Sequence, residues 1–508
     1  MSSRIVDTPD AVSRGSLGHT GLVVLDGIGL GIADVVRLAE GNARPVPGTD
    51  AMRRVTVSWD AARQIAATGR VYGRSTGVGA NRNEDVPTDT AAEHGLRLLR
   101  SHAGAIGDEL PAREVRAMLA VRANQLLAGG AGLRPTVVTA LCEALESGAH
   151  PVVNEFGSVG TGDIAALAQA ALALAGEAPW RGPGAPKPQQ LDNNDALAFI
   201  SSNALTLGQS ALALDELRGL VEATQVVAAL SLLAVDGSHE AYAAPVHAAR
   251  PHRGSTDVAR RMRELIGAAD RPTPPLGRIQ DPYGFRCLPQ IHGPALDAAD
   301  GLEEVVRIEI NAAAENPLIS AEDMAAYHHG GFYQAQLALA LDHFRLALTQ
   351  VARLSTSRLS TLNEPGFTRL RPFLANEEPA ASGVMILEYA AGAALGDLRA
   401  FSAPASLGHA VLSRGVEEQA SFASLAARQT LRACRAYRLV VGCELVAAVR
   451  ALAQRGLRPE PDLPVGRALG LAESVLSRDQ ADRPLTDDVT AAAALLDRFT
   501  DIWRGSGS

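Results

Sequence analysis

The segment Tyr72–Gly79 sets a tyrosine among glycine and serine residues and reads Tyr-Gly-Arg-Ser-Thr-Gly-Val-Gly. This composition predicts a loop rather than a helix. Loops held by a rigid scaffold commonly carry chemistry, which makes Tyr72 a candidate functional residue. From these residues alone, the alternative stays open that the Tyr72 hydroxyl only anchors its own loop.

A second polar cluster lies in the segment 280–290, between two prolines. Gln280, Tyr283 and Arg286 recur every three residues and could share one side of a short turn. They would present an amide, a phenol and a guanidinium, a set that suits a carboxylate ligand because Arg can bind both oxygens at once. A purely structural salt bridge of Arg286 is the competing interpretation.

The third segment, Gly157–Asp163, reads Gly-Ser-Val-Gly-Thr-Gly-Asp. Its glycines remove side-chain obstruction and predict a very tight turn. Asp163 could cap the helix expected from Ile164 onward. A tight loop with a helix cap, and no further role, is the simpler alternative.

Two other patterns carry no chemistry in our interpretation. The stretch Gly27–Gly31 has neither the spacing of the dinucleotide-binding motif nor that of the P-loop, so we expect an ordinary turn. The histidines, including the pair His328-His329, lack the helical pairing with a nearby carboxylate that is typical of zinc sites. We therefore expect no metal.

The composition narrows the class of protein. The chain of 508 residues has a formal charge of −9 and no basic block, which argues against a nucleic-acid partner. Its N-terminus has no apolar core of the kind a signal peptide needs, and no uncharged stretch reaches a membrane span. The four cysteines are too few and scattered for a disulfide framework. We expect a cytoplasmic protein with buried thiols and no membrane contact.

Ala- and Leu-rich stretches with helical periodicity dominate the sequence and predict long helices. We expect these helices at 165–174, 204–234, 334–359, 380–401 and 415–455. The economical architecture is mainly α, a bundle of long antiparallel helices. A turn at 482–487 predicts one last helix. We expect an N-terminal domain over residues 1–200 and the helical bundle over 201–508.

Together and in order, the three polar segments resemble the histidine, phenylalanine and tyrosine ammonia-lyases and the related aminomutases. The likeness runs from about Leu25 to Leu495. It includes Arg100-Ser101-His102-Ala103-Gly104, Arg122-Ala123-Asn124-Gln125-Leu126, Glu309-Ile310-Asn311, Glu315-Asn316-Pro317-Leu318, the region Ser355 to Arg358 and Asp482-Arg483-Pro484-Leu485.

This resemblance implies a largely helical homotetramer of the ammonia-lyase type, similar to the fumarase and aspartase fold, with active sites built from more than one subunit. In the family, an Ala-Ser-Gly tripeptide cyclises and dehydrates into the electrophile methylidene-imidazolone (MIO), which takes up the substrate amine. Tyr72 matches the tyrosine base that removes the β-proton, and Arg286 matches the arginine that holds the carboxylate. His102 matches a position that faces the substrate side chain. Further active-site positions fall on Tyr283, Gln280 and Glu417.

The cofactor-forming loop departs from the family pattern Gly-Ser-Val-Gly-Ala-Ser-Gly-Asp, because this chain is one residue shorter there. Counted back from Asp163, the tripeptide becomes Gly160-Thr161-Gly162. The glycine whose nitrogen attacks is kept, so a threonine-derived ring with an extra methyl group is conceivable. The shortened loop leads us to expect no cofactor, with this MIO-like ring as the alternative.

Other active-site positions also differ. The family asparagine that supports cofactor and substrate aligns with Ser201 or, after a small shift, with Asn203. The sequence Gly415-Val416-Glu417-Glu418-Gln419 keeps the family glutamate and loses the glutamine before it. Phe332-Tyr333-Gln334 replaces the Asn-Phe-His of the histidine lyases. The substrate-binding residues are thus expected to include Phe332, and amino-acid specificity does not transfer.

Our leading expectation is a divergent lyase-family enzyme that works without MIO. Tyr72 would be its base, Glu417 an acid or orienting carboxylate, and Arg286 the clamp on a small aromatic or conjugated carboxylate. Such acid–base groups suit elimination, isomerisation or cyclisation. One alternative is an ammonia-lyase or aminomutase with a ring made from Gly160-Thr161-Gly162, and another is a silent paralogue that binds a ligand or an active subunit.

Overall fold

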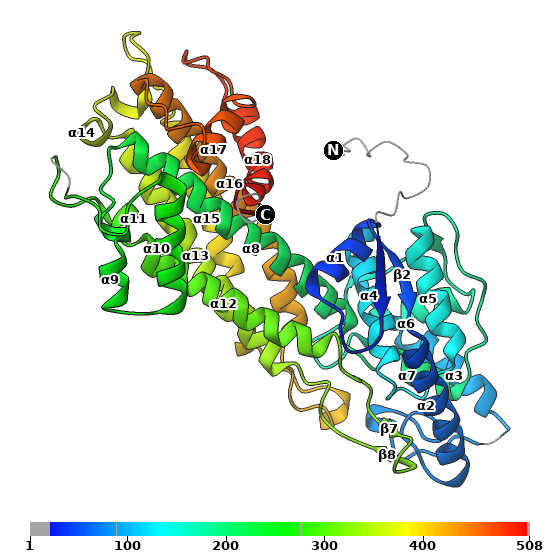
Figure 1. Ribbon diagram of the computed structural model, residues 1–508. Helices are drawn as coiled ribbons and strands as arrows, with labels where there is room; N and C mark the ends of the chain where they lie inside the picture. Colours follow the sequence, from blue (N-terminus) through cyan, green and yellow to red (C-terminus); the bar gives the residue numbers. More distant parts are fainter. Residues whose placement is uncertain (1–20, 88, 275–276, 505–508) are drawn as a thin grey trace, which may run out of the picture. The chain divides into compact units, whose positions relative to one another are not determined.

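The computed structural model describes residues 21–87, 89–274 and 277–504, and the chain divides into two compact units (Figure 1). Unit 1 contains the described residues up to Ser158, Gly162–Gly208 and Ile310–Phe332. Unit 2 contains Val159–Thr161, Gln209–Glu309 and the described chain from Tyr333 onward. The chain therefore leaves and re-enters each unit. The expected division at 200/201 did not anticipate the return of 310–332, because hydrophobic periodicity carries no information on which distant segment a strand pairs with.

Unit 1 combines helices with short two-stranded sheets. Strand β1 (Leu22–Leu25) pairs in parallel with β2 (Arg44–Pro47), while β7 (Leu318–Ser320) pairs antiparallel with β8 (Ala325–Tyr327). The remaining pairs are β3 (Ile106–Glu109) with β5 (Asn154–Phe156) and β4 (His150–Pro151) with β6 (Trp180–Arg181). The helices are α1 (Ile32–Glu40), α2 (Thr49–Thr68), α3 (Ala91–His102), α4 (Ala112–Leu127), α5 (Pro135–Ser147), α6 (Ile164–Leu174) and α7 (Asn193–Ile200).

Helix α4 forms the centre of unit 1, and every residue from Val115 to Leu127 is buried. Buried polar side chains must find partners, and those of α4 bind other segments. Asn124 donates to the Ile310 carbonyl and accepts the N–H of Gly27, at 2.8 and 2.9 Å. Gly27 itself has φ +76°, so the glycine-rich stretch forms a turn there.

The returning segment packs against α2. In Figure 1, β7 and β8 lie beside the blue helix α2, far from it in sequence. Ala61 and Ala62 of α2 pack on Ile319 of β7. On α4, the buried Arg122 donates to Glu315 of this segment at 2.8 Å. The segment 310–332 thus supplies both apolar contact and a counter-charge to unit 1.

Unit 2 is a bundle of long helices. The longest are α8 (Ala204–Ala234), whose first residues belong to unit 1, α12 (Leu288–Glu309), α13 (Ala335–Asn363), α15 (Ile386–Phe401), α16 (Ala423–Arg455) and α18 (Thr486–Arg504). Shorter ones are α9 (Ala244–Ala248), α10 (Arg253–Ile266), α11 (Tyr283–Arg286), α14 (Pro365–Thr368) and α17 (Pro464–Glu473). Helix α16 packs on α13, α15 and α18, and α12 packs on α10 and α13. The expectation of a mainly α bundle is confirmed.

Most predicted helices are found within a few residues, but two begin later than expected. Helix α15 starts at Ile386 instead of residue 380, and α16 starts at Ala423 instead of residue 415. Gly415 and Phe422 have φ of +83° and +53°, which a right-handed helix does not tolerate. The stretch before α16 is therefore loop, and it carries Glu417.

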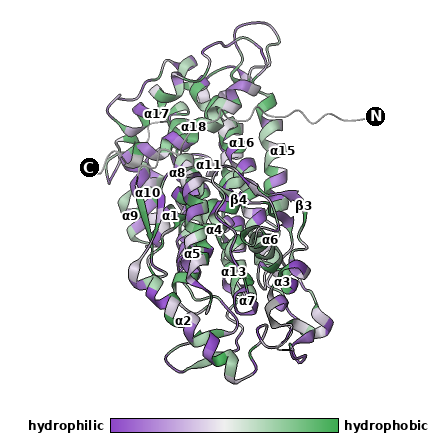
Figure 2. Ribbon diagram, turned by 90° about the vertical axis from the view of Figure 1, so that its right-hand side faces the viewer, coloured by the Kyte–Doolittle hydropathy of each residue, from purple (hydrophilic) through white to green (hydrophobic). Residues whose placement is uncertain are grey.

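Small residues allow the bundle helices to approach closely. A Cβ atom added to Gly254 of α10 would lie 2.3 Å from the carbonyl oxygen of Gly293 in α12. Figure 2 shows α2 and the bundle helices with mixed hydrophobic and hydrophilic residues, as helices with one buried side require. Glycine against glycine is what lets α10 and α12 pack backbone to backbone.

Unit 2 buries an ion pair between two of its long helices. Arg358 of α13 donates to both carboxylate oxygens of Glu444 in α16, at 2.6 and 2.8 Å. Both side chains are fully buried. Ser231 and Ser355 donate to the same carboxylate. Burial of charge is tolerated only with such complete pairing, so this network fixes how three helices meet.

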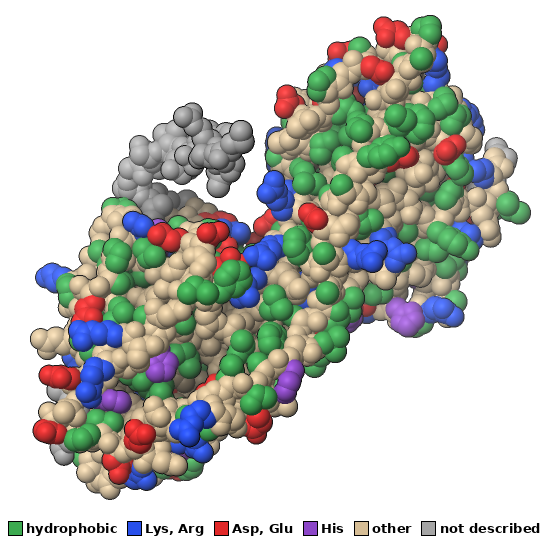
Figure 3. Space-filling model, turned by 180° about the vertical axis from the view of Figure 1, so that it is seen from behind, with side chains coloured by type: hydrophobic (Ala, Val, Ile, Leu, Met, Phe, Trp, Pro, Cys, Tyr) green, Lys and Arg blue, Asp and Glu red, His purple; other side chains and the backbone are tan. Residues whose placement is uncertain are grey.

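Unit 2 also leaves apolar side chains uncovered on this single chain. Ile386 and Tyr389 of α15 are 58% and 67% exposed. Leu339 and Leu346 of α13 are exposed as well. Figure 3 shows apolar side chains gathered on the surface of unit 2. Large contiguous apolar surface is unusual on a monomer.

One apolar segment, Asn193–Ala234, is long and hydrophobic enough to cross a membrane by length and composition alone. Of its most apolar window, 78% is buried within the protein. Such burial is what the core helix of a folded bundle requires, since a membrane-spanning helix turns its apolar surface to lipid.

Candidate active site

The Tyr72 loop belongs to unit 1 and follows helix α2. Residues 72–78 are not helical, as the sequence predicted, and a short 3-10 turn follows at Gly79–Asn81. A bridge between Thr76 and Asp85 closes the loop. The phenol oxygen of Tyr72 accepts the backbone N–H of Gly79 at 2.7 Å. An N–H donated to this oxygen stabilises negative charge on it, which is the form in which a phenol acts as a base. The Tyr72 and His328 rings also pack nearly perpendicular to one another, with centroids 6.3 Å apart.

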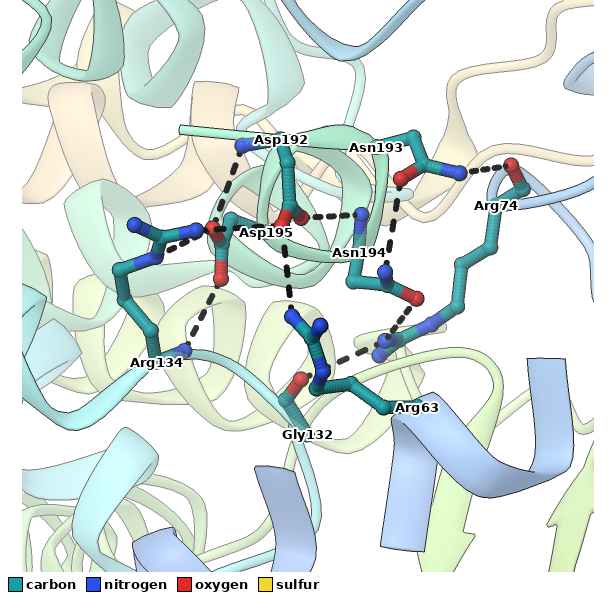
Figure 4. Close-up of polar contacts among 8 residues, drawn as sticks. All are labelled: Arg63, Arg74, Gly132, Arg134, Asp192, Asn193, Asn194 and Asp195. Carbon is teal, nitrogen blue, oxygen red and sulfur yellow. Dashed lines mark hydrogen bonds and ion pairs between the residues drawn. The ribbon is translucent and has the colours of Figure 1, made fainter. Parts of the chain in front are cut away.

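Arg74 fixes the base of this loop (Figure 4). Its buried guanidinium donates to the carbonyls of Ala131 and Gly132, at 2.6 and 3.3 Å. The Asn193 side chain at the start of α7 donates to the Arg74 carbonyl at 2.9 Å. Burial lowers the pKa of Arg74 to about 10, an effect that the nearby Asp195 opposes. The loop is thus tied to the helix that leads into residues 201–203.

Acidic residues at the start of α7 complete this cluster. Asp195 accepts the side chain of Arg134 at 2.8 Å, and Asp192 accepts the same guanidinium at 3.1 Å. Burial raises the pKa of Asp195, and the adjacent Asp192 carboxylate raises it further. Figure 4 shows these groups converging from α7, from the loop before α5 and, through Arg63, from α2. They brace the frame of the candidate site and do not themselves form a catalytic set.

The shortened loop is pinched at its two ends in unit 1. The Ser158 hydroxyl donates to the Gly162 carbonyl at 3.1 Å. Gly160 and Gly162 have φ of +89° and +123°. Residues other than glycine rarely adopt these backbone angles. The very tight turn that the sequence predicted is therefore present despite the missing residue.

Asp163 stands at the start of α6, but the prediction that it caps this helix is wrong. Its carboxylate accepts the backbone N–H and the hydroxyl of Thr206, at 2.7 and 2.9 Å. No cap hydrogen bond to α6 is formed. Burial raises the pKa of Asp163, and the hydrogen bonds from Thr206 oppose that shift. The side chain thus joins the loop to α8 instead of capping the start of α6.

Of the two candidates for the family asparagine, Asn203 is the one that contacts the loop. Its side-chain oxygen accepts the N–H of Gly162 at 3.0 Å, and its amide donates to the Phe332 carbonyl at 2.8 Å. Ser201 instead accepts the N–H of Asn316 at 2.9 Å. Unit 1 thus brings Gly162, Asn203 and Phe332 together and leaves Ser201 in a backbone contact.

In unit 2, the middle residues of the same loop meet the segment just before α16. The Ser421 hydroxyl donates to the Gly160 carbonyl at 2.6 Å, and the Phe422 N–H donates to the Val159 carbonyl at 2.8 Å. Ser421 is buried. No local pattern singles out Ser421, because its partner lies 261 positions earlier in the chain.

The predicted carboxylate-binding set is only partly assembled. The guanidinium of Arg286 lies over the Tyr283 ring at 4.7 Å, and both belong to the short helix α11. Arg286 spends one donor on the Asp281 carbonyl at 3.1 Å. Tyr283 is 67% exposed. Gln280 lies outside this turn and is exposed, so the three residues do not share one helical side as expected.

Glu417 and His102 occupy accessible positions. Glu417 is exposed in the loop before α16, where its backbone pairs with Leu412. His102 ends α3, and its Nδ1 lies 2.9 Å from the Leu98 carbonyl. The Ser101 hydroxyl lies 3.0 Å from the same nitrogen. Among the described residues, no group of histidines, cysteines and carboxylates could hold a metal ion.

Most of the chain matches a known family. The family model described as aromatic amino acid lyase covers residues 30–472. The chain belongs to the aromatic amino acid lyase family. It is 35% identical over 493 residues to a histidine ammonia-lyase of Geobacillus kaustophilus (strain HTA426), covering 94% of this chain and 97% of the relative. This lyase is thus an enzyme of the C–N lyase type, as the sequence led us to expect.

Solved structures agree on the fold. The lyase is similar to the ergothionase of Treponema denticola, with a TM-score of 0.87 and 26% identity, covering 95% of this chain and 99% of the other. It is equally similar to the tyrosine aminomutase of Streptomyces globisporus, with a TM-score of 0.87 and 26% identity over 95% and 98% of the two chains. The expected resemblance is confirmed in sequence and in fold.

Family membership corrects one expectation. We expected no cofactor, and this is wrong, because the aromatic amino acid lyases to which the chain belongs make MIO from their own backbone. The expectation of MIO-independent catalysis rested on the same argument and falls with it. The loop itself fits the group: Thr161 carries the hydroxyl that must be lost, and Gly160 and Gly162 flank it with backbone angles open to a tight turn.

Proposed function

We propose that this lyase acts on histidine or an aromatic α-amino acid, with an MIO-like electrophile formed from Gly160, Thr161 and Gly162. The main support for this proposal is the tight turn of the loop. There the Ser158 hydroxyl donates to the Gly162 carbonyl, and the Asn203 side chain accepts the Gly162 N–H. A loop meant only as a connection has no need of glycines at positive φ on both sides of a hydroxyl residue. The 35% identical histidine ammonia-lyase makes histidine the first substrate to test.

When formed, the ring supplies an electrophile for the substrate amine, which makes the β-proton removable. The chain's own residues then divide the work. Tyr72, with its oxygen held by the Gly79 N–H, accepts the β-proton. Asn203 positions the loop by accepting the Gly162 N–H, and it positions Phe332, which would line the substrate pocket, by donating to its carbonyl.

The carboxylate of the substrate would be bound by Arg286. Its guanidinium is stacked on Tyr283 and donates once to the Asp281 carbonyl, which leaves further N–H groups for a bidentate contact. Tyr283 and Glu417 then line the amino-acid end of the substrate. His102 would face the substrate side chain, where an imidazole ring can exchange a hydrogen bond with an imidazole or a phenol.

We further propose a homotetramer with active sites shared between subunits, acting in the cytoplasm on a small molecule. Tyr283, Gln280 and Glu417 are exposed on the single chain. Four apolar side chains of α13 and α15 are exposed as well: Leu339, Leu346, Ile386 and Tyr389. Catalytic groups and apolar surface that are uncovered in one chain are what assembly with further copies would cover.

Two measurements test this function. Peptide mass mapping of the purified enzyme should find the peptide with residues 160–162 lighter by two water molecules. Incubation with histidine, phenylalanine or tyrosine should then release ammonia together with the matching acrylate. An unmodified loop, or a modified enzyme inactive on all three amino acids, would refute the proposal as stated.

An aminomutase reaction is the second candidate, favoured by the close similarity to the Streptomyces globisporus tyrosine aminomutase. Product analysis separates the two. A mutase returns the amine to the substrate and gives a β-amino acid without net ammonia, whereas a lyase gives ammonia and acrylate in equal amounts.

A further inference from the structure

The carbonyl of Gly160 has an unusual environment for a loop backbone group. It accepts the hydroxyl of Ser421 at 2.6 Å, and Ser421 is 4% exposed. The same hydroxyl oxygen accepts the N–H of Ala423 at 3.3 Å. Ala423 is the first residue of α16, a helix of 33 residues. Ser421 therefore links the Gly160 carbonyl to the positive end of a long helix.

Glycine at position 160 is what makes this contact possible. A Cβ atom there would lie 2.3 Å from the Ser421 oxygen and 2.6 Å from the Ala423 nitrogen. An alanine, which the family tripeptide has at its first position, would have to push Ser421 away. The change to Gly160 and the approach of Ser421 are thus one structural feature of this chain.

The chemistry of ring closure gives the contact a purpose. The Gly162 nitrogen attacks the carbonyl carbon of Gly160 and forms a C–N bond, so negative charge develops on the Gly160 oxygen. That oxygen leaves as water when a double bond forms from the carbon to the Thr161 nitrogen. Thr161 then loses its hydroxyl and its α-hydrogen as a second water. Atoms and electrons balance without an oxidant or reductant.

We propose that Ser421 is a positioning residue for this self-modification, donating its hydroxyl to the Gly160 oxygen as charge develops there. The inference rests on the proposed function, since it requires that the ring forms. A preorganised donor in a site closed to water is worth far more than one in solution. Asn203 complements it at the other end of the tripeptide by accepting the Gly162 N–H, which aligns the attacking nitrogen.

The test follows loop mass, not catalysis. Three proteins are expressed separately and compared: the wild-type enzyme, Ser421→Ala and Ser402→Ala. The last is a matched control that removes a buried hydroxyl elsewhere in unit 2. Peptide mass mapping at fixed times after induction gives the fraction of chains that have lost two waters. Loss of one oxyanion donor typically slows a reaction by about 10²–10³-fold, so Ser421→Ala should remain largely unmodified while the control matches wild type.

Each outcome decides something. If Ser421→Ala loses water as fast as wild type, the role of Ser421 is refuted and the proposed function stands. If wild type is itself unmodified, the proposed function fails and this inference with it. If circular dichroism and elution volume show that Ser421→Ala does not fold, loop modification is compared between Ser421→Thr and Ser421→Val, whose new side chains are similar in size. The hydroxyl of Thr should restore modification, and equal modification in both would overturn the proposal.

Discussion

The Tyr72 oxygen is fixed by an amide from its own loop, and the loop in turn is fixed by Arg74. This arrangement positions a phenol without using any group of the substrate, which is how a preorganised base works. The neighbouring His328 belongs to the histidine pair in which the sequence showed no zinc-site spacing. It packs against the Tyr72 ring, which no local pattern could indicate.

Replacing Tyr72 by Phe tests the base. The variant keeps the ring that packs on His328 and removes only the proton acceptor. We expect normal folding, normal loop mass and turnover at least about 10²-fold slower on the best substrate. Steady-state kinetics and loop mass mapping measure both. Unchanged turnover would show that another group takes the proton.

His292 in α12 should make stability depend on pH. It is fully buried, neither ring nitrogen has a hydrogen-bond partner among the residues that the structure describes, and burial lowers its pKa well below the usual value of 6.5. Below about pH 6.5 the unfolded chain takes up a proton that the folded chain refuses. Stability is therefore full above that pH and falls by about 1.4 kcal/mol per pH unit below it.

The measurement is thermal unfolding between pH 7.5 and 5.5. His292→Leu should lose less stability over this range than wild type, because its unfolded state gains one proton fewer. His94, His150 and His239 have pKa values lowered by burial as well, so some slope should persist. A variant at the exposed His409 is the control. Identical slopes for His292→Leu and wild type would contradict the assignment.

At the scale of elements, the buried ion pair of Arg358 and Glu444 holds α13 and α16 together. Glu444→Ala would leave a buried arginine without its counter-charge and two serines without their acceptor. Breaking a buried pair from one side typically costs about 3–5 kcal/mol. Chemical denaturation should show this loss, while Glu264→Ala, at an exposed pair in α10, should change little.

How far the sequence predicted the elements depends on what each one needs. Long Ala- and Leu-rich helices such as α8 and α13 follow from periodicity, because their own residues decide both structure and burial. The starts of α15 and α16 could not be predicted, because loop residues with positive φ have no side-chain signature. Asp163 was misassigned for a related reason: its position marks a helix start, but its partner Thr206 comes from another helix.

The candidate site was predictable to a similar degree. Tyr72 and the pair Tyr283 and Arg286 were found from composition and spacing, and each lies in the loop or turn expected. The contact of Ser421 with Gly160 and that of Asn203 with Gly162 could not be predicted. Both join residues that are far apart in the sequence and meet only in the folded chain. The shortened loop misled us about the cofactor, since the missing residue does not prevent a tight turn.

At the scale of the molecule, assembly can be tested through the apolar face of α15. We expect light scattering on the eluting protein to give four chains. Changing Ile386 and Tyr389 together to Asp places charges in the surface that further copies would bury, and should give smaller species with far lower activity. Val475→Asp, an exposed apolar residue elsewhere, is the control. A wild-type monomer at micromolar concentration would refute the shared site.

The discontinuity of unit 1 also has a consequence for biosynthesis. When a ribosome has made the chain as far as Gly208, most of unit 1 exists, but β7, β8 and Glu315 do not. Arg122 then has no carboxylate, and Ala61 and Ala62 have no Ile319 to cover them. About another hundred residues, all of them in unit 2, must be synthesised before the segment that completes unit 1 appears. Over that interval, α2 and α4 present an unfinished surface to chaperones.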